Sequence, residues 1–127
     1  IDRSDSKSNH RDLRKVTNED EIFDFLKKEG FSIIRLGDLN FIDQVNLFNN
    51  ASQIIGLHGA GFANLVFCKP NTFVLEFKSI TAGNVIGNLA RNQSINFHEI
   101  AIKPLSEDNN QQGLISVPID EIRKKLT

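Results

Sequence analysis

A chain of 127 residues is long enough for one domain with a hydrophobic core, and its composition, 39% hydrophobic and 24% charged, is ordinary for a globular domain. The formal net charge of −1 gives no reason to expect nucleic-acid binding, and no apolar run approaches the roughly 20 residues of a membrane-spanning helix. Cys68 is the only cysteine, and His10, His58 and His98 lack the spacing of metal ligands, so we expect neither an internal disulfide nor a bound metal.

The N-terminal stretch is predicted to be the end of a strand followed by a basic loop. Ile1 to Arg3 read as the tail of a strand whose body lies upstream, and residues 4–11 are polar. Arg3 and Arg14 stand on either side of this loop. Since arginine offers paired donors to phosphate oxygens, the loop could clamp a phosphate. A solvated loop without a ligand is the alternative.

A helix, a strand and a second helix are predicted next. Thr17 or Asn18 can cap the first helix, acidic residues fill its first turn, and Gly30 is a plausible C-cap. Residues 31–36 are predicted to be a strand that ends at Gly37-Asp38. Residues 41–51 carry apolar side chains at helical spacing and predict a second amphipathic helix.

The stretch 54–67 predicts a strand, a glycine turn and a helix. Glycines in the turn, His58-Gly59-Ala60-Gly61, can take positive φ and let a ligand come close. The helix would point unpaired N–H groups and a partial positive charge at the turn. We therefore expect an anion site, typically for phosphate, with His58 at the carboxyl end of the strand. The alternative is that Gly59 and Gly61 only shape a connection and that His58 is a histidine satisfied by structural partners.

Residues 72–77 are predicted to be a buried strand with one carboxylate, Glu76, near its carboxyl end. In nucleotide-binding βαβ units, an acidic residue about 20 residues after the glycine turn accepts hydrogen bonds from ribose hydroxyls. Glu76 follows His58 by eighteen residues, which makes it a candidate ribose-binding residue. The alternative is a surface glutamate beside Lys78.

The remaining elements complete an alternation of helices and strands. A short helix is expected at 84–92, a strand at 95–102 and a last helix from Val117 onward. Together with the strand at 53–57, this alternation predicts an α/β fold, a Rossmann-like three-layer domain with a mostly parallel sheet. Residues 1–127 are expected to form a single domain.

The chain resembles glycosyltransferase family 61, and the run around His58 is the specific part of that resemblance. The residues that carry it are, in order, Arg3, Arg14-x-Val16-x-Asn18-Glu19, Gln44, Ile54-Ile55-Gly56-x-His58-Gly59-Ala60-Gly61-x-x-Asn64-Leu65-x-Phe67 and Val74-Leu75-Glu76.

The resemblance implies one half of a GT-B glycosyltransferase: the C-terminal, donor-binding domain, with the N-terminal domain of the same chain absent from this sequence. The implied reaction is an inverting, metal-independent transfer of a hexosyl or pentosyl group from a nucleotide sugar, expected to be UDP-linked, to a glycan or protein acceptor. No cofactor is implied. Capsular polysaccharide or other glycan biosynthesis is the expected setting.

The implied site residues bind the donor. Arg3, Arg14 and His58 would contact the diphosphate, and Gly59, Ala60 and Gly61 would present backbone N–H groups to it. Asn64 would orient the turn or contact the ligand, and Glu76 would hold the ribose. No general base is evident, so the base is expected in the missing domain, and the isolated fragment is expected to be inactive.

Two other readings stay open at the level of sequence. One is a non-catalytic nucleotide-binding or regulatory α/β module, and the other is an α/β domain in which the glycine turn only packs. A bacterial member would be cytoplasmic or membrane-peripheral, which the composition favours, and a eukaryotic one would act in the secretory lumen.

Overall fold

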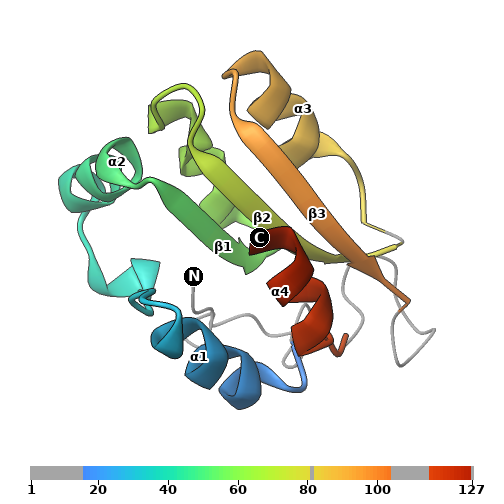
Figure 1. Cartoon of the computed structure of the whole chain (residues 1–127). Helices are drawn as coiled ribbons and strands as arrows, with labels where there is room; N and C mark the ends of the chain where they lie inside the picture. The colour runs from blue at the N-terminus through green and yellow to red at the C-terminus, as the bar shows by residue number, and fades with distance from the viewer. Residues whose placement is uncertain (1–15, 81, 104–114, 127) are drawn as a thin grey trace, which may run out of the picture.

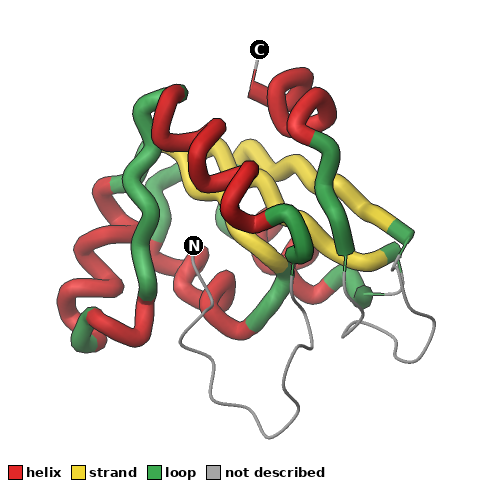
Figure 2. The backbone as a smooth tube through the Cα atoms, turned by 90° about the horizontal axis from the view of Figure 1, so that it is seen from below, coloured by secondary structure: helices red, strands yellow, loops and turns green. Residues whose placement is uncertain are grey.

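The computed structural model describes residues 16–80, 82–103 and 115–126, which form a three-layer α/β arrangement of Rossmann-like type (Figures 1 and 2). The elements in chain order are α1 (Glu19–Lys28), the 3-10 helix η1 (Leu36–Asp38), α2 (Phe41–Asn50), β1 (Gln53–Leu57), the 3-10 helix η2 (Ala60–Phe67), β2 (Phe73–Ser79), α3 (Val85–Asn92), β3 (Asn96–Ile102) and α4 (Ile119–Leu126). No helix within these ranges is long and apolar enough to cross a membrane.

The sheet has the order β1-β2-β3, and both pairings are parallel. Ile55 of β1 lies opposite Leu75 of β2, which lies opposite His98 of β3. Helical crossovers, η2 and then α3, join the strands, as parallel pairing requires. The predicted α/β class and the strands predicted at 53–57, 72–77 and 95–102 are confirmed, with shifts of one or two residues at their ends.

Alternate residues of the strands supply two hydrophobic clusters, one on each face of the sheet. Ile55, Leu75 and Phe77 pack with α1 and α4. Ile54 and Val74 pack with α2, η2 and α3 on the other face. Because successive strand side chains point to opposite faces, Glu76 and Lys78, two and four residues after Val74, lie on the same side of the sheet as η2 and α3.

The strand predicted at 31–36 is wrong for the described residues. Residues 31–34 have no regular structure, and η1 begins at Leu36. A cavity of about 410 Å³ lies between this segment and β1, lined on one side by Phe31 to Ile34 and on the other by Ser52 to Ile55. Arg35 alone is a bridge residue, and among the described residues the segment forms no ladder with β1.

The ends of α1 show where local signals succeeded and failed. Gly30, with φ 94°, ends the helix as predicted: its N–H bonds to Lys27 O at 3.1 Å, and Phe31 N bonds to Leu26 O at 2.9 Å. Asn18 precedes the helix but does not cap it. Its side chain instead exchanges two hydrogen bonds with the backbone of Val117, which ties α1 to the start of the C-terminal helix.

Candidate functional site

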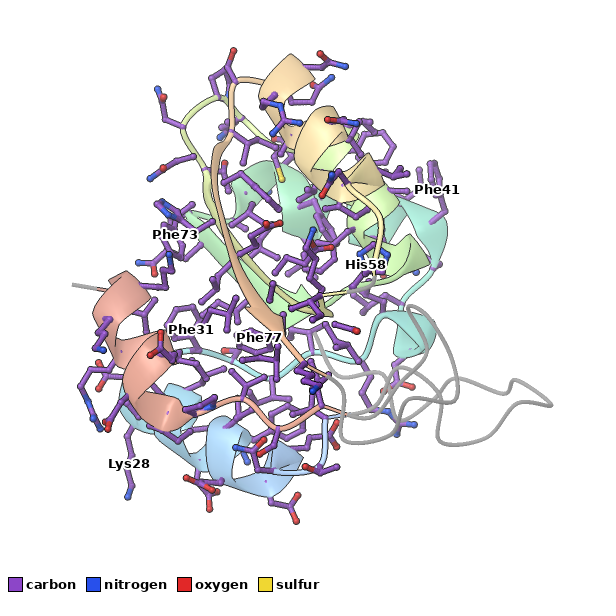
Figure 3. The ribbon with its side chains drawn as sticks, turned by 90° about the vertical axis from the view of Figure 1, so that its right-hand side faces the viewer. Lys28, Phe31, Phe41, His58, Phe73 and Phe77 are labelled. Carbon is purple, nitrogen blue, oxygen red and sulfur yellow. The ribbon has the colours of Figure 1, made fainter. Side chains whose placement is uncertain are left out.

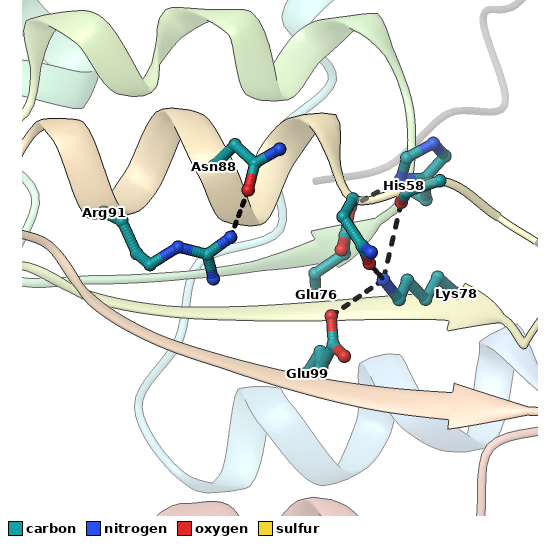
Figure 4. Close-up of polar contacts among 8 residues, drawn as sticks. His58, Glu76, Lys78, Asn88, Arg91 and Glu99 are labelled. Carbon is teal, nitrogen blue, oxygen red and sulfur yellow. Dashed lines mark hydrogen bonds and ion pairs between the residues drawn. The ribbon is translucent and has the colours of Figure 1, made fainter.

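His58, which directly follows β1, and Glu76, the fourth of the seven residues of β2, form a buried pair (Figure 4), and Figure 3 labels His58 within the whole domain. The carboxylate expected near the carboxyl end of its strand lies in the middle of it, because β2 continues to Ser79. His58 Nδ1 lies 2.6 Å from Glu76 Oε2, and the side chains are 10% and 1% exposed. The His58 backbone continues the parallel ladder, since its N–H donates to Phe77 O at 2.7 Å. The sheet therefore holds both partners, and the contact with Glu76 Oε2 orients the His58 ring.

The glycine turn follows His58 directly and differs from the expectation in two respects. Gly59 has φ 163° and ψ 177°, which is extended backbone open to any residue, so a positive φ does not explain why glycine stands at this position. At Gly61 a Cβ would lie 3.0 Å from Leu36 Cδ1, so close packing against Leu36 explains the glycine at this position. The following helix is η2, a 3-10 helix whose first bond runs from Phe62 N to Gly59 O at 3.1 Å. Its start still directs N–H groups toward the turn.

Asn64 is held by α2. Its Nδ2 donates to Gln44 Oε1 at 2.9 Å, while Gln44 Nε2 donates to the carbonyls of Leu36 and Leu39 at 2.9 and 3.2 Å. Of the two predicted roles of Asn64, orientation of the turn fits this network directly. From the helical pattern of residues 41–51 alone, Gln44 is expected to be an exposed polar residue. In the structure it is half-buried and bridges η1, α2 and η2.

A second polar pair lies beside the first on the same face of β2. Lys78 is 4% exposed, and its Nζ lies 2.8 Å from Glu99 Oε2 on β3. The same ammonium group donates to Asn84 Oδ1 at 3.1 Å and to Gly83 O at 3.4 Å. Figure 4 shows the ion pair of Lys78 with Glu99. Lys78 thus joins the segment that leads into α3 to the end of the sheet.

The structure places His58 and the glycine turn directly after β1, Asn64 within η2, and Glu76 in contact with the His58 ring. Arg3 and Arg14 lie outside the described residues, so their part in the site stays a prediction. The binding role of each remaining residue, including ribose binding by Glu76, also stays a prediction. Within residues 16–80, 82–103 and 115–126, no three His, Cys, Asp or Glu side chains gather as metal ligands do.

Sequence reasoning missed two features of this end of the sheet, the burial of Lys78 and the bridging role of Gln44. A signal for Lys78 was present: it stands two residues after Glu76 in an apolar strand, so both must point to the same face. Gln44 gave no comparable signal, because an amide at one helix position has the same pattern whether it is solvated or bridging.

The profile of the family described as Glycosyltransferase 61 matches residues 1–75, which is more than half of the chain. The chain belongs to glycosyltransferase family 61. The matched residues include the glycine turn, His58 and Asn64, so the part of the structure built around β1 and η2 is the part that the family shares.

Two curated relatives are much longer than this chain. The mouse EGF domain-specific O-linked N-acetylglucosamine transferase is 31% identical over 91 residues, which cover 68% of this chain and 17% of that protein. The Arabidopsis thaliana beta-1,2-xylosyltransferase is 34% identical over 79 residues, covering 52% of this chain and 15% of that protein. The chain therefore spans about a sixth of the length of these relatives. No solved structure matches it.

Proposed function

We propose that this chain is the donor-binding part of an inverting, metal-independent glycosyltransferase with the two-domain GT-B arrangement. The substrate would be a nucleotide sugar, with a UDP-sugar as the first to test, and the acceptor a glycan or protein within glycan biosynthesis. Family 61 membership supports the transfer of a sugar. The names of the relatives, an N-acetylglucosamine transferase and a xylosyltransferase, support a sugar donor of this class.

The observation that carries the proposal is the His58–Glu76 pair beside the glycine turn. A departing nucleoside diphosphate leaves negative charge that a metal-free site must stabilise with hydrogen-bond donors. His58 stands at the carboxyl end of a parallel strand, the place where open α/β sheets bind ligands, and its ring is anchored at Nδ1 by Glu76. The start of η2 adds backbone N–H groups next to it. In the proposed site, Arg3 and Arg14 supply further positive charge.

Calorimetry of the full-length protein with UDP, GDP, CDP and NAD, each in magnesium and in EDTA, tests the proposal. We expect one nucleoside diphosphate to bind equally well in both buffers. His58→Ala should weaken that binding by roughly 10- to 100-fold, the range of a hydrogen bond to a charged group.

His98→Ala is the matched control, because His98 is on β3, stacks on Phe73 and bonds to Asn96 Oδ1. It should leave the affinity unchanged. Binding that requires magnesium, or that both histidine variants weaken alike, would overturn the proposal. Binding without any sugar transfer to an acceptor would instead favour a regulatory nucleotide-binding module.

A further inference from the structure

We propose that Gln44 is a positioning residue of the donor site: it holds Asn64 by Nδ2 and so leaves Asn64 Oδ1, a hydrogen-bond acceptor, as the atom offered to the ligand. An acceptor of this kind takes a sugar hydroxyl group and not a phosphate oxygen. This inference rests on the proposed function and names the substrate group that Asn64 would contact. The juxtaposition that carries it is the 2.9 Å contact between Asn64 Nδ2 and Gln44 Oε1.

The Gln44 amide is held in one orientation by the backbone on its other side. Its Nε2 donates to Leu36 O at 2.9 Å and to Leu39 O at 3.2 Å, the carbonyls of the first residue of η1 and of the residue that follows η1. A carbonyl oxygen can only accept a hydrogen bond. Turning the amide by 180° would place Oε1 against both carbonyl oxygens, and both hydrogen bonds would be lost. The two carbonyls therefore direct Gln44 Oε1 toward Asn64.

The orientation of Gln44 determines the orientation of Asn64. Because Gln44 Oε1 only accepts, the amide NH2 of Asn64 must face it, and Asn64 Oδ1 lies on the opposite side of that amide. Among the described residues, Oδ1 accepts no hydrogen bond, and the buried side-chain atom that lacks a partner there is Glu76 Oε1. Since Asn64 is half-buried, Oδ1 is the end of its amide that is open to solvent.

The Gln44–Asn64 pair lies one helical turn along η2 from the glycine turn. In a 3-10 helix, residues three apart lie on the same side, about 6 Å apart along the axis. Asn64 therefore follows Gly61 on one side of η2. Leu36 joins the two levels, because its Cδ1 packs against Gly61 while its carbonyl accepts from Gln44. A ligand with its diphosphate at the glycine turn would bring a neighbouring part of the molecule, beyond the phosphates, to the level of Asn64.

A solvent-exposed acceptor selects the chemistry of its ligand. A hydroxyl group donates its proton to an amide oxygen, whereas a phosphate oxygen would face Asn64 Oδ1 with lone pairs on both sides and repel it. A nucleotide sugar carries hydroxyl groups on the ribose and on the transferred sugar, one on each side of the diphosphate. Asn64 would therefore accept from a sugar hydroxyl, and binding measurements can separate the ribose from the transferred sugar.

The first test reads the Asn64 amide directly, in the full-length protein labelled with ¹⁵N at asparagine. The side-chain NH2 signals of Asn64 are assigned by their loss in Asn64→Leu. Gln44→Met should shift these signals and speed their exchange with solvent, because Nδ2 loses its acceptor. Asn49→Ala is the matched control, since it also removes a side-chain hydrogen bond between α2 and η2, from Asn49 Nδ2 to Phe67 O at 3.0 Å, and should leave the signals in place. Asn64 signals that Gln44→Met leaves unchanged would overturn the inference.

The second test compares inorganic pyrophosphate, UDP, UDP-N-acetylglucosamine and UDP-xylose by calorimetry on the full-length protein. Asn64→Leu should leave the affinity for pyrophosphate within about twofold of wild type, because no phosphate contact is lost. It should weaken the ligand that carries the contacted hydroxyl by roughly 3- to 10-fold, the range of a neutral hydrogen bond. A ribose contact predicts weaker binding of UDP and of both UDP-sugars, and a contact with the transferred sugar predicts weaker binding of a UDP-sugar alone.

Gln44→Met should weaken the same ligand as Asn64→Leu, and combining the two should add little, because residues that act as one unit are not additive. Asn49→Ala should leave every affinity at its wild-type value. An Asn64→Leu variant that loses affinity for pyrophosphate as strongly as for UDP would show a phosphate contact and overturn the inference. Unchanged affinity for all four ligands would overturn it as well.

If Asn64→Leu fails to fold, Gln44→Met decides the question, because it leaves Asn64 in place and removes only the group that orients it. If neither a nucleoside diphosphate nor a UDP-sugar binds the wild-type protein, the proposed function fails, and the ligand contact of Asn64 fails with it. The side-chain NH2 signals then still report whether Gln44 orients Asn64.

Discussion

The two faces of β2 differ in what they bury. On the α1 and α4 face, Leu75 and Phe77 are 0% and 4% exposed and enter an apolar cluster. On the opposite face, Glu76 and Lys78 are 1% and 4% exposed, hence equally buried, although burying charge costs free energy that burying leucine does not. A fold that needed only stability would place apolar side chains on both faces. The polar face is therefore where we expect function, and the apolar face is where we expect stability.

The largest effect is expected from a substitution in the apolar face. Leu75→Ala removes a fully buried side chain and should lower the free energy of unfolding by about 2–5 kcal/mol, measured by urea denaturation. The affinity of the remaining folded protein for its nucleotide should stay within twofold. Ile80→Ala, at a residue 57% exposed just after β2, is the control and should stay within about 0.5 kcal/mol of wild type. A Leu75→Ala variant that folds normally but loses nucleotide affinity would contradict the division between the faces.

A smaller effect is expected on the polar face. Lys78→Met should cost about 1–3 kcal/mol, because it removes the ion pair to Glu99 and the bonds to Asn84 and Gly83. The cost stays below that of a fully buried pair, since the Glu99 side chain is 42% exposed and water can solvate it. Thermal and urea unfolding measure the change, and Lys103→Met at an exposed position is the control. Unchanged or higher stability would mean that the face tolerates apolar replacement and that Lys78 is retained for another reason.

Features that depend on local sequence patterns could be predicted from the sequence, and features that depend on contacts between distant segments could not. The short apolar runs at β1 and β2 and the alternation of apolar and polar residues at β3 located these strands, because those signals lie within the strands themselves. The pairing of His58 with Glu76 could not be predicted from the sequence. A separation of eighteen residues is compatible with several strand registers, and the observed register, with Leu57 opposite Phe77, is one in which the two side chains are in contact. The strand predicted at 31–36 was wrong for a related reason: a short apolar segment can be extended, but its pairing depends on which strand lies beside it.

A third prediction sharpens the role of the glycine turn. Gly61→Ala should cost about 1 kcal/mol, since the new Cβ would lie 3.0 Å from Leu36 Cδ1 and push that side chain aside. Gly83→Ala, where a Cβ meets nothing within 4 Å, is the matched control and should be neutral. Combining Gly61→Ala with Leu36→Ala should relieve the clash, which a double-mutant cycle on unfolding free energy would detect. If Leu36→Ala gives no relief, the glycine is required for something other than packing against Leu36.

The smallest effect concerns Cys68, the one thiol of the chain, buried in the cluster of the η2 face. Burial raises the pKa of this thiol from 9.0 to about 11. Because the unfolded chain releases the proton at lower pH than the folded protein, the thiol's contribution to stability is complete below pH 9 and falls as the pH rises toward 11.

The stability difference between wild type and Cys68→Ala should therefore shrink steadily between pH 9 and 11, measured by urea unfolding at fixed ionic strength. The lysines also titrate in this range, but they are common to both proteins and cancel in the difference. A difference that stays constant across these pH values would mean that the thiol is as solvated as in the unfolded chain. The same burial predicts slow alkylation of Cys68 by iodoacetamide in the native protein at pH 8, because the thiolate is the reactive form. Fast labelling in folded protein would show that this part of the η2 face opens to solvent, which would place the polar face among the less stable parts of the domain.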